Sequence, residues 1–454
     1  MSIRAHVVSP SESLRSAALG ARGASVDRRP RPSHSHSHSH SLHSRGLSTE
    51  LCTDRDLLQA VLASGVREIV SVPCSITDTW HALAADEAAR GRLRLVMTAH
   101  EGNLAGIAGG IWFGTGRPAL VHMQNSGLPN AGDGFISFAD REVFGVPMCA
   151  LVTFRGATAS DASEPHQAIG RRTDALVSAV FGPEAAIEGS RDGFESLPSF
   201  ERALYAASGG GIGVMKLAES GFVKSGLPWF ATAHAPQAAS LSASRCARVR
   251  ATATLDSRRI ESSLDARPTR DDAIRAIAAR HPHAALLFCN GFTARAGRAL
   301  VDSPRCLYNI GYMGGTLAIG WGLATSRPDV EVVVIDGDQN ALMSAMKEQL
   351  RADFPPNLHW YVLDNGIGAS VGTSVSVPLG ASLEDLAEVI ATRPDEPGSF
   401  RHPRVSAVGA RFDHEAPGEM QGTLRALSFR FREWLASGEA SLLAPAAISN
   451  RSPR

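Results

Sequence analysis

The sequence predicts an α/β protein made of two doubly wound domains, each built on a parallel sheet. Three observations support this: apolar strands alternate with helical segments in both halves, each half opens on a helix-capping box, and a stretch without apolar periodicity separates the halves. Strands that are apolar throughout are typical of parallel sheets covered by helices on both faces. With 454 residues, the chain is long enough for two or three domains.

The first half opens with a helix and then alternates strands with helices. Thr53-Asp-Arg-Asp56 forms a capping box, apolar residues follow at helical spacing, and Gly65 marks the predicted end of the helix. Strands are predicted at 68–72, 95–98, 118–123 and 147–153, and helices at 101–113 and 127–139.

The second half repeats the same rhythm, which predicts a second sheet of the same kind. Thr269-Arg-Asp-Asp272 is again a capping box with apolar residues at helical spacing behind it. Strands are predicted at 284–289, 331–335 and 358–363, and helices at 315–324 and 340–352.

Composition divides the chain into five segments. Residues 1–48 are rich in Arg, Ser and His and bury too little apolar surface to order, so a disordered segment is predicted there. Its Ser-His alternation could bind a metal ion loosely, and an over-extended start site or a transit peptide are alternative explanations. The remaining predictions are a domain at 49–225, a linker at 226–267, a domain at 268–437 and a tail at 438–454.

Charge and cysteine usage narrow the classes of partner. Lys+Arg and Asp+Glu are equal at 45 each, which favours neither a nucleic-acid nor an acidic membrane partner. The six cysteines are scattered without a C-x-x-C pair, as in reduced thiols of a cytoplasmic protein. No apolar run reaches the roughly 18 residues that a membrane helix needs. We therefore expect a cytoplasmic protein that acts on a small molecule.

An acidic turn follows one predicted strand of the second half, and an amide follows the next. Asp338 ends the first of these strands and Asn365 ends the second. Together with the backbone carbonyl of Ile367, they would offer hard oxygen ligands of the kind that Mg²⁺ prefers. The helix expected near Asn340 would point its amides at a diphosphate. A plain acidic turn is the alternative, and Asn365 at the end of the neighbouring strand favours the metal site.

Glu101 opens a helix directly after a strand of the first half. A carboxylate at this position can simply be a first-turn acid that the helix dipole favours. A buried carboxylate can also exchange a proton with an aromatic nitrogen of a cofactor. Both interpretations stay open on the residues alone.

Polar side chains follow two further strands of the first half, where ligands gather in α/β folds. Gln124, Asn125 and Ser126 end one strand, and Arg155 ends the next, with His166 in the polar loop beyond it. An arginine at such a strand end is a good fork for an anion. Loop hydrogen bonding and a solvated ion pair are the structural alternatives.

Taken together, these motifs resemble those of thiamine-diphosphate-dependent enzymes. Glu101, the pair Gly337-Asp338 with Asn365, and Met313 before them match the family pattern. Within the superfamily the chain resembles the phosphonopyruvate and sulfopyruvate decarboxylases. The stretches that match best are 72–75, 101–103, 123–127, 155–156, 164–166, 312–314, 336–343, 365–366 and 370–372. The implied fold is a pyrimidine-binding and a diphosphate-binding domain without a middle domain.

The resemblance implies a role for each matched residue. Glu101 would hydrogen-bond the aminopyrimidine of thiamine diphosphate, and Met313 would hold the cofactor in its bent conformation. Asp338, Asn365 and the Ile367 carbonyl would bind Mg²⁺. The remaining cofactor contacts would come from Gly314, Gly337, Gln339 and Asn340, and substrate contacts from Gln124, Asn125, Ser126, Arg155 and His166.

Several positions depart from the family pattern. Gln339 replaces the usual third glycine of the acidic turn, and Asp364 replaces the first of two asparagines. Cys74 stands where an aspartate is common, and 367–369 replace a stretch that often contains histidine and aspartate. The last change removes an acid/base pair near the substrate, so it bears on the identity of the substrate.

The implied activity is decarboxylation of 3-phosphonopyruvate to phosphonoacetaldehyde and CO₂ in phosphonate biosynthesis, including antibiotic pathways. Sulfopyruvate decarboxylation and carboligation of a related 2-oxo acid are alternatives, and a non-catalytic paralogue is a further one. The family places its sites between subunits, which implies a homo-oligomer.

Overall fold

The computed structural model describes residues 52–156, 163–182, 187–188, 212–218, 222–224, 268–346, 349–350, 353–365, 405–409 and 422–441. The predicted segment 1–48, the linker 226–267 and Ile367 lie outside these ranges. The proposed domain boundaries therefore stay predictions. Among the described helices, none combines the length and the apolar character that crossing a membrane requires.

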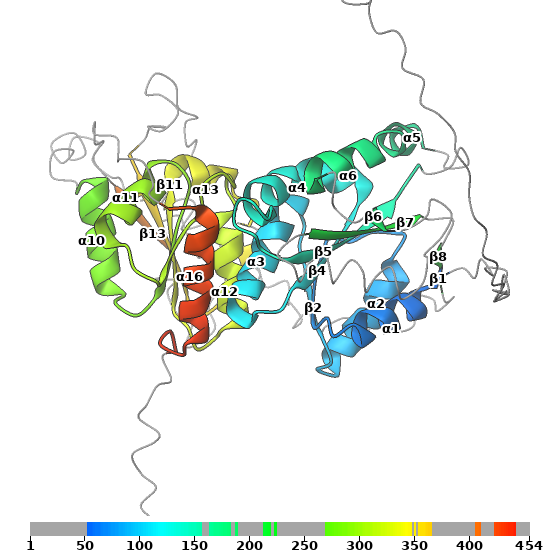
Figure 1. The fold of residues 1–454 in the computed structure, drawn as a ribbon, viewed down its shortest axis with the longest axis horizontal. Helices are drawn as coiled ribbons and strands as arrows, with labels where there is room; N and C mark the ends of the chain where they lie inside the picture. Colours follow the sequence, from blue (N-terminus) through cyan, green and yellow to red (C-terminus); the bar gives the residue numbers. More distant parts are fainter. Residues whose placement is uncertain are drawn as a thin grey trace, which may run out of the picture. The chain divides into compact units, whose positions relative to one another are not determined.

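The first sheet is parallel throughout, as the strand pattern predicts. Its order is β3 (Arg94–Met97), β2 (Glu68–Ser71), β4 (Ala119–Gln124), β5 (Met148–Phe154), β7 (Ile212–Ala218) and β6 (Ile187–Glu188). Helices α1 (Asp54–Ala63) and α2 (Asp78–Ala89) lie on one face of this sheet (Figure 1). The other face is covered by α3 (Leu104–Thr115), α4 (Leu128–Gly134) and α6 (Thr173–Phe181), and a short parallel pair is formed by β1 (Cys52–Thr53) and β8 (Phe222–Val223).

The second sheet is also parallel. Its order is β10 (Cys306–Tyr308), β9 (Ala285–Phe288), β11 (Val332–Gly337), β12 (Leu358–Asp364) and β13 (Val405–Gly409). The predicted α/β class with two parallel sheets is thus confirmed. Its described helices are α10 (Arg270–Arg280), α11 (Phe292–Val301), α12 (Thr316–Ser326), α13 (Asp338–Met343) and α16 (Leu424–Ala436).

Both predicted capping boxes are present. The Thr53 side chain accepts from the Asp56 amide while the Asp56 carboxylate accepts from the Thr53 amide, and Thr269 and Asp272 do the same at α10. Two predicted helices are interrupted. The one expected at 101–113 opens with a 3-10 turn, η1 (Glu101–Asn103), and the one expected at 127–139 is divided among η2 (Asn125–Gly127), α4 and the π-helical η3 (Phe135–Ala139).

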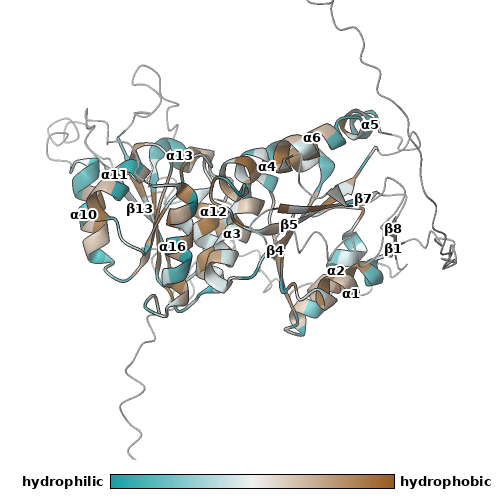
Figure 2. Cartoon of the chain, viewed as in Figure 1, coloured by the Kyte–Doolittle hydropathy of each residue, from teal (hydrophilic) through white to brown (hydrophobic). Residues whose placement is uncertain are grey.

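Among the residues that the structure describes, apolar side chains form three clusters, two of which are local to one sheet. The outer face of the first sheet packs against α1 and α2, and that of the second packs against α10 and α11. A third cluster contains residues of both sheets, such as Val121 and Val334, together with α3 and α12 between them. Brown, hydrophobic colouring marks β4 and β5 in Figure 2, in keeping with their burial. Of the cysteines, Cys74, Cys149, Cys289 and Cys306 are free and buried.

Helices α3 and α12 approach each other at backbone distance because glycines line their contact. A Cβ on Gly110 would overlap the Ile319 carbonyl, and a Cβ on Gly322 would overlap the Ile107 carbonyl. Overlap with backbone cannot be relieved by a side-chain rotation. The glycines therefore fix the loops that precede both helices close to each other, and these loops carry the candidate site.

A buried polar network lies beneath the first sheet's strand ends. The Ser71 hydroxyl lies 2.7 Å from Nε2 of His81 and 2.8 Å from Nδ1 of His122, and Thr77 Oγ1 lies 3.2 Å from the other nitrogen of His122. Burial lowers the pKa of His81 to about 4 and the pKa of His122 well below its usual value. Both rings are therefore neutral at physiological pH.

We expect these histidines to cost stability in mild acid. The unfolded imidazole of His81 takes up a proton below pH 6.5 and the folded one only near pH 4, so stability falls as pH drops between these values. The loss for His81 is about 2 kcal/mol between about pH 7 and pH 5. Denaturant unfolding of wild type and of His81→Gln at both pH values measures this loss. An equal change in the free energy of unfolding with pH in the two proteins would contradict it. The comparison cancels Asp336 and Asp338, whose raised pKa values act in the opposite direction.

Candidate active site

The acidic turn at the end of β11 is held in place by the hydrogen bonds of a buried carboxylate. Asp336 is fully buried, and its carboxylate accepts hydrogen bonds from Nδ2 of Asn340 at 2.6 Å and from Nε1 of Trp360 at 2.8 Å. Burial raises the pKa of Asp336 to about 6. Both oxygens of Asp336 are engaged, so it anchors the turn, and the candidate metal ligand is the next carboxylate, Asp338.

The Asp338 carboxylate, which follows β11, contacts residues at the end of β12. Asp338 is 5% exposed, and its carboxylate accepts from the backbone amides of Gln339, at 2.6 Å, and of Asn365. The Asp364 carboxyl contacts it as well. Burial, with the neighbouring Asp364, raises the pKa of Asp338 to about 6. A cation between these oxygens would relieve the repulsion, so the donor set fits a hard divalent metal such as Mg²⁺.

The turn that carries Met313 is hydrogen-bonded to α4 of the first half and to α13 of the second. The amide of Gly314 donates to Oδ1 of Asn340 at 2.8 Å, and the amide of Met313 donates to Oδ2 of Asp133 at 2.8 Å. Gly314 has a φ of +70°, and a Cβ there would press on the Met343 backbone. The Met313 side chain is 53% exposed, so it is open to a ligand. Asn340 has both amide atoms engaged internally, which favours a positioning role.

Glu101 follows β3 and begins η1, where a packed environment orients its carboxylate. Oε2 of Glu101 accepts from Nδ2 of Asn130 at 3.0 Å. A Cβ on Gly127 would overlap or crowd the Glu101 carboxylate, so the absence of a side chain at 127 makes room for it. The preceding His100 accepts from the Gly102 amide at 3.0 Å and caps the turn.

The loop of Glu101 contacts the second sheet's turns within the same chain. The Tyr312 hydroxyl donates to the Gly102 carbonyl, and Nδ2 of Asn103 donates to the Ala345 carbonyl at 3.3 Å. Burial raises the pKa of Tyr312 above its usual value, which keeps this hydroxyl a donor. These contacts bring the Glu101 loop to the Met313 turn and to the segment that follows α13.

The polar loop after β4 divides into supporting and accessible residues. Asn125 is fully buried: its amide donates to the Arg155 carbonyl and to Thr173, and its Oδ1 accepts from the Arg155 amide. This favours a positioning role over substrate contact for Asn125. Nε2 of Gln124 donates to Ser126 at 2.6 Å, and Ser126 is exposed. Gln124 and Ser126 are therefore the accessible polar groups of this loop.

Arg155 and His166 are brought to the same region by a glycine contact. Gly156 has a φ of +70°, and a Cβ there would overlap the His166 carbonyl in α5 (Glu164–Gly170). The Arg155 guanidinium donates to the Ser75 hydroxyl at 2.6 Å. Lys224 donates to the Ser75 carbonyl at 2.7 Å and pairs with Asp78. Two cationic side chains thus meet at Ser75.

Sequence reasoning missed several of these residues. Asn130, Asp133 and Lys224 give no signal in the sequence, because each acts through a partner far along the chain. Gly127 lies inside a matched motif, although its effect on Glu101 needs coordinates. Asp364 is not among the predicted ligands, and the structure places its carboxyl against that of Asp338. The predicted ligand Ile367 lies outside the described residues.

Comparison with known proteins confirms the resemblance. The chain is 28% identical over 364 residues to a phosphonopyruvate decarboxylase of Streptomyces viridochromogenes, covering 74% of this chain and 84% of that protein. It is 29% identical over 344 residues to a phosphonopyruvate decarboxylase of Streptomyces hygroscopicus, covering 74% and 79%. No protein-family profile matches the chain.

Two further proteins are similar to this chain, one in sequence and one in structure. A sulfopyruvate decarboxylase subunit beta of Methanothermobacter thermautotrophicus is 38% identical over 107 residues, which are 22% of this chain and 57% of that subunit. A thiamine diphosphate-dependent 4-hydroxybenzoylformate decarboxylase of Rhodococcus jostii RHA1 aligns in structure over 80% of this chain and 99% of that one. The TM-score of this alignment is 0.46, and the sequence identity is 14%.

Proposed function

We propose that this chain is a thiamine-diphosphate-dependent decarboxylase that converts 3-phosphonopyruvate to phosphonoacetaldehyde and CO₂. The similarity to two phosphonopyruvate decarboxylases over most of the chain supports the activity. One structural observation carries the proposal: the loop of Glu101 touches the Met313 turn, and that turn is bonded to the acidic strand end of β11. These are the two groups of residues that the family uses to hold its cofactor.

The residues at the ends of β11 and β12 fit the charged end of the cofactor. Asp338 and Asn365, with the predicted carbonyl of Ile367, would hold Mg²⁺, whose other ligands would be diphosphate oxygens and water. When bound, thiamine diphosphate supplies the electron sink that loss of CO₂ from a 2-oxo acid needs. Met313 is exposed at the turn where the cofactor's central part would lie.

Glu101 would hold and move a proton at a nitrogen of the aminopyrimidine ring. Asn130 fixes one carboxylate oxygen, and the missing side chain of Gly127 makes room for the other. The carboxylate is thus oriented before any ligand arrives, which general acid–base catalysis requires. Asn130 and Gly127 are positioning residues in this proposal.

A dianionic substrate suits the charge at the ends of β4 and β5. Arg155 presents a planar fork to an anion, and Lys224 meets it at Ser75. Asp78, which pairs with Lys224, offsets one of these two positive charges, and the net positive charge that remains at Ser75 favours a phosphonate dianion over a sulfonate monoanion. Ser126 and Gln124 complete the proposed substrate contacts, and His166 lies on α5 beside the Arg155-Gly156 turn.

We expect kcat/KM for 3-phosphonopyruvate to exceed that for sulfopyruvate at least tenfold, or about 1.4 kcal/mol in transition-state stabilisation. Lys224→Gln should narrow the ratio by lowering mainly the phosphonate value, because it removes one positive charge. Aldehyde release measured with each acid tests this. Equal or reversed values would favour sulfopyruvate decarboxylation, and a carbon–carbon coupled product formed with added aldehyde would favour carboligation.

We also propose a homo-oligomer, in which two chains exchange halves so that each site is shared. The family resemblance supports the exchange. The contacts described above lie within one chain, so a site built from one chain is the alternative. Co-expressing Glu101→Gln with Asp338→Asn separates the two cases. With exchange, each mixed dimer has one intact site of its two. Random pairing makes about half of the dimers mixed, so about one quarter of wild-type activity should return. No recovery would place both halves of each site in one chain.

A further inference from the structure

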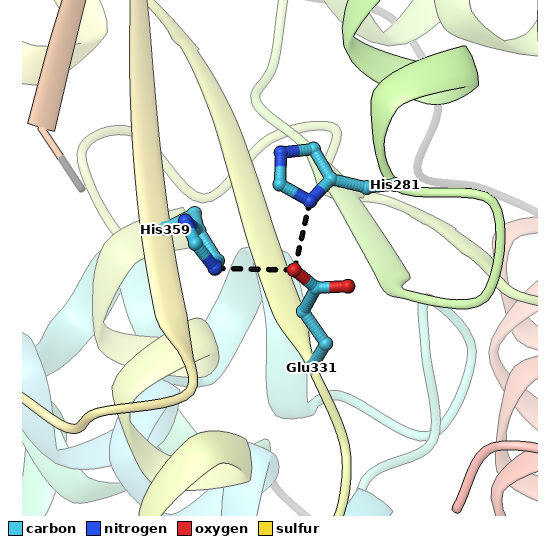
Figure 3. Close-up of side chains that lie close together, drawn as sticks. All are labelled: His281, Glu331 and His359. Carbon is cyan, nitrogen blue, oxygen red and sulfur yellow. Dashed lines mark hydrogen bonds and ion pairs between the residues drawn. The ribbon is translucent and has the colours of Figure 1, made fainter. Parts of the chain in front are cut away.

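Two histidines and a glutamate converge at the edge of the second sheet where its strands begin (Figure 3). His281 follows α10, Glu331 immediately precedes β11, and His359 is the second residue of β12. Oε1 of Glu331 lies 2.8 Å from Nδ1 of His281 and 3.1 Å from Nε2 of His359. These three ligand atoms all lie within 4.8 Å of one another.

This cluster is separate from the proposed cofactor site. Asp338 follows the last residue of β11, whereas Glu331 precedes its first, so the whole strand lies between them. At about 3.3 Å per residue the separation is roughly 20 Å. The proposed decarboxylation makes no use of His281, Glu331 or His359.

The backbone around the cluster is firmly held. Nη1 of Arg305 donates to the carbonyls of His281 at 2.9 Å and of Ala284 at 3.0 Å, which fixes the loop after α10. The Ala285 amide donates to the Glu331 carbonyl at 2.8 Å. His359 pairs with Val333 in the sheet ladder. Side chains on such fixed positions form a site before a ligand arrives.

A fourth residue orients one of the imidazoles. The second ring nitrogen of His281, Nε2, lies 2.8 Å from the Tyr361 hydroxyl, on the neighbouring part of β12. Metal-binding histidines commonly direct their other nitrogen at such an oxygen, which fixes the ring and its tautomer. His281 is buried, while Glu331 and His359 are partly exposed, so an ion has access from one side.

We propose that His281, Glu331 and His359 form a transition-metal site, with Zn²⁺ as its ion and Tyr361 as a positioning residue. Two imidazoles and one carboxylate suit Zn²⁺ and disfavour Mg²⁺, which takes oxygen ligands. Zinc at this place would join the end of α10 to the starts of β11 and β12. A fourth position would remain for water.

Binding requires a rearrangement of protons that the cluster can accommodate. In the hydrogen-bonded cluster the two ring nitrogens that face Glu331 carry hydrogen, and the carboxylate accepts from both. With zinc bound, both nitrogens present their lone pairs to the ion. Each ring then carries its proton on the other nitrogen: His281 on Nε2, which donates a hydrogen bond to the Tyr361 oxygen, and His359 on Nδ1. The carboxylate becomes the third ligand.

The test is a calorimetric titration of the full chain with Zn²⁺ in the presence of thiamine diphosphate and excess Mg²⁺. Because the tract at the N-terminus would also bind zinc, His34, His36, His38, His40 and His43 are first replaced by serine. We expect one Zn²⁺ per chain. His359→Gln should weaken binding at least tenfold, and Tyr361→Phe about tenfold. His283→Gln is the matched control, since this exposed neighbour lies outside the cluster and should change nothing.

A second measurement does not depend on how well the variants fold. Co²⁺ added to the chain with an intact cluster should give the visible absorption of a nitrogen- and oxygen-coordinated ion, and Zn²⁺ should displace it. Zn²⁺ should also raise the Tm of this chain. No stoichiometric Zn²⁺ binding and no Co²⁺ band would overturn the proposal and leave a hydrogen-bonded cluster only.

Discussion

Replacing Glu101 with glutamine is expected to lower kcat for 3-phosphonopyruvate by about 10²- to 10⁴-fold, the range that a positioned general acid–base contributes. Glutamine has nearly the same shape and can still accept from Asn130, so the fold and the binding of the cofactor should persist. What is lost is the exchange of a proton with the aminopyrimidine. Steady-state kinetics together with a cofactor-binding titration separate these effects.

Two further variants make the Glu101 test specific. Glu142→Gln changes an exposed glutamate of the same half and should leave turnover unchanged. Asn130→Ala removes the hydrogen bond to Oε2 and should lower kcat less than Glu101→Gln, with KM little altered, because it only frees the orientation of the carboxylate. Wild-type turnover in Glu101→Gln would remove Glu101 from the mechanism.

Replacing Asp338 with asparagine should move activity and stability in opposite directions. Turnover is expected to fall at least about 10²-fold, and half-saturation by Mg²⁺ should rise, because a charged ligand is lost. The free energy of unfolding should rise by up to about 3 kcal/mol, since the raised pKa of Asp338 reports a buried charge beside another carboxyl. Kinetics at varied Mg²⁺ and denaturant unfolding measure the two.

Asp364→Asn is the matched variant for this prediction. It relieves the same repulsion but leaves the buried charge of Asp338 in place, so it should stabilise the fold by less than Asp338→Asn does. The family resemblance does not make Asp364 a ligand, so activity should be far less affected. If Asp364→Asn abolished turnover while Asp338→Asn retained it, the assignment of the metal ligands would be reversed.

The main elements of the fold could be predicted because their signals are local. The capping boxes at Thr53 and Thr269 are complete within four residues, and strands such as β5 and β12 are apolar runs. The strand β10 is only three residues long, so it carries no pattern of its own. A helix is predicted over 340–352, but α13 ends at Met343, where the backbone becomes extended at Ser344.

The candidate site could be predicted only where chemistry and strand ends coincide. Asp338 and Asn365 end neighbouring strands, and parallel strands bring their carboxyl ends to one edge. The burial of Asn125 and the contact of Asp364 with Asp338 depend on packing between distant segments. The same is true of His281, Glu331 and His359, whose meeting at the opposite edge has no local pattern in the sequence.

The dependence of turnover on thiamine diphosphate and Mg²⁺ tests the proposed activity most directly. Protein stripped of both is given 3-phosphonopyruvate, and CO₂ and phosphonoacetaldehyde are followed after each component is restored alone and together. We expect both products to be released in equal amounts, and only when thiamine diphosphate and a divalent ion are present together. Equal turnover in stripped and restored protein, or none in either, would contradict the proposed activity.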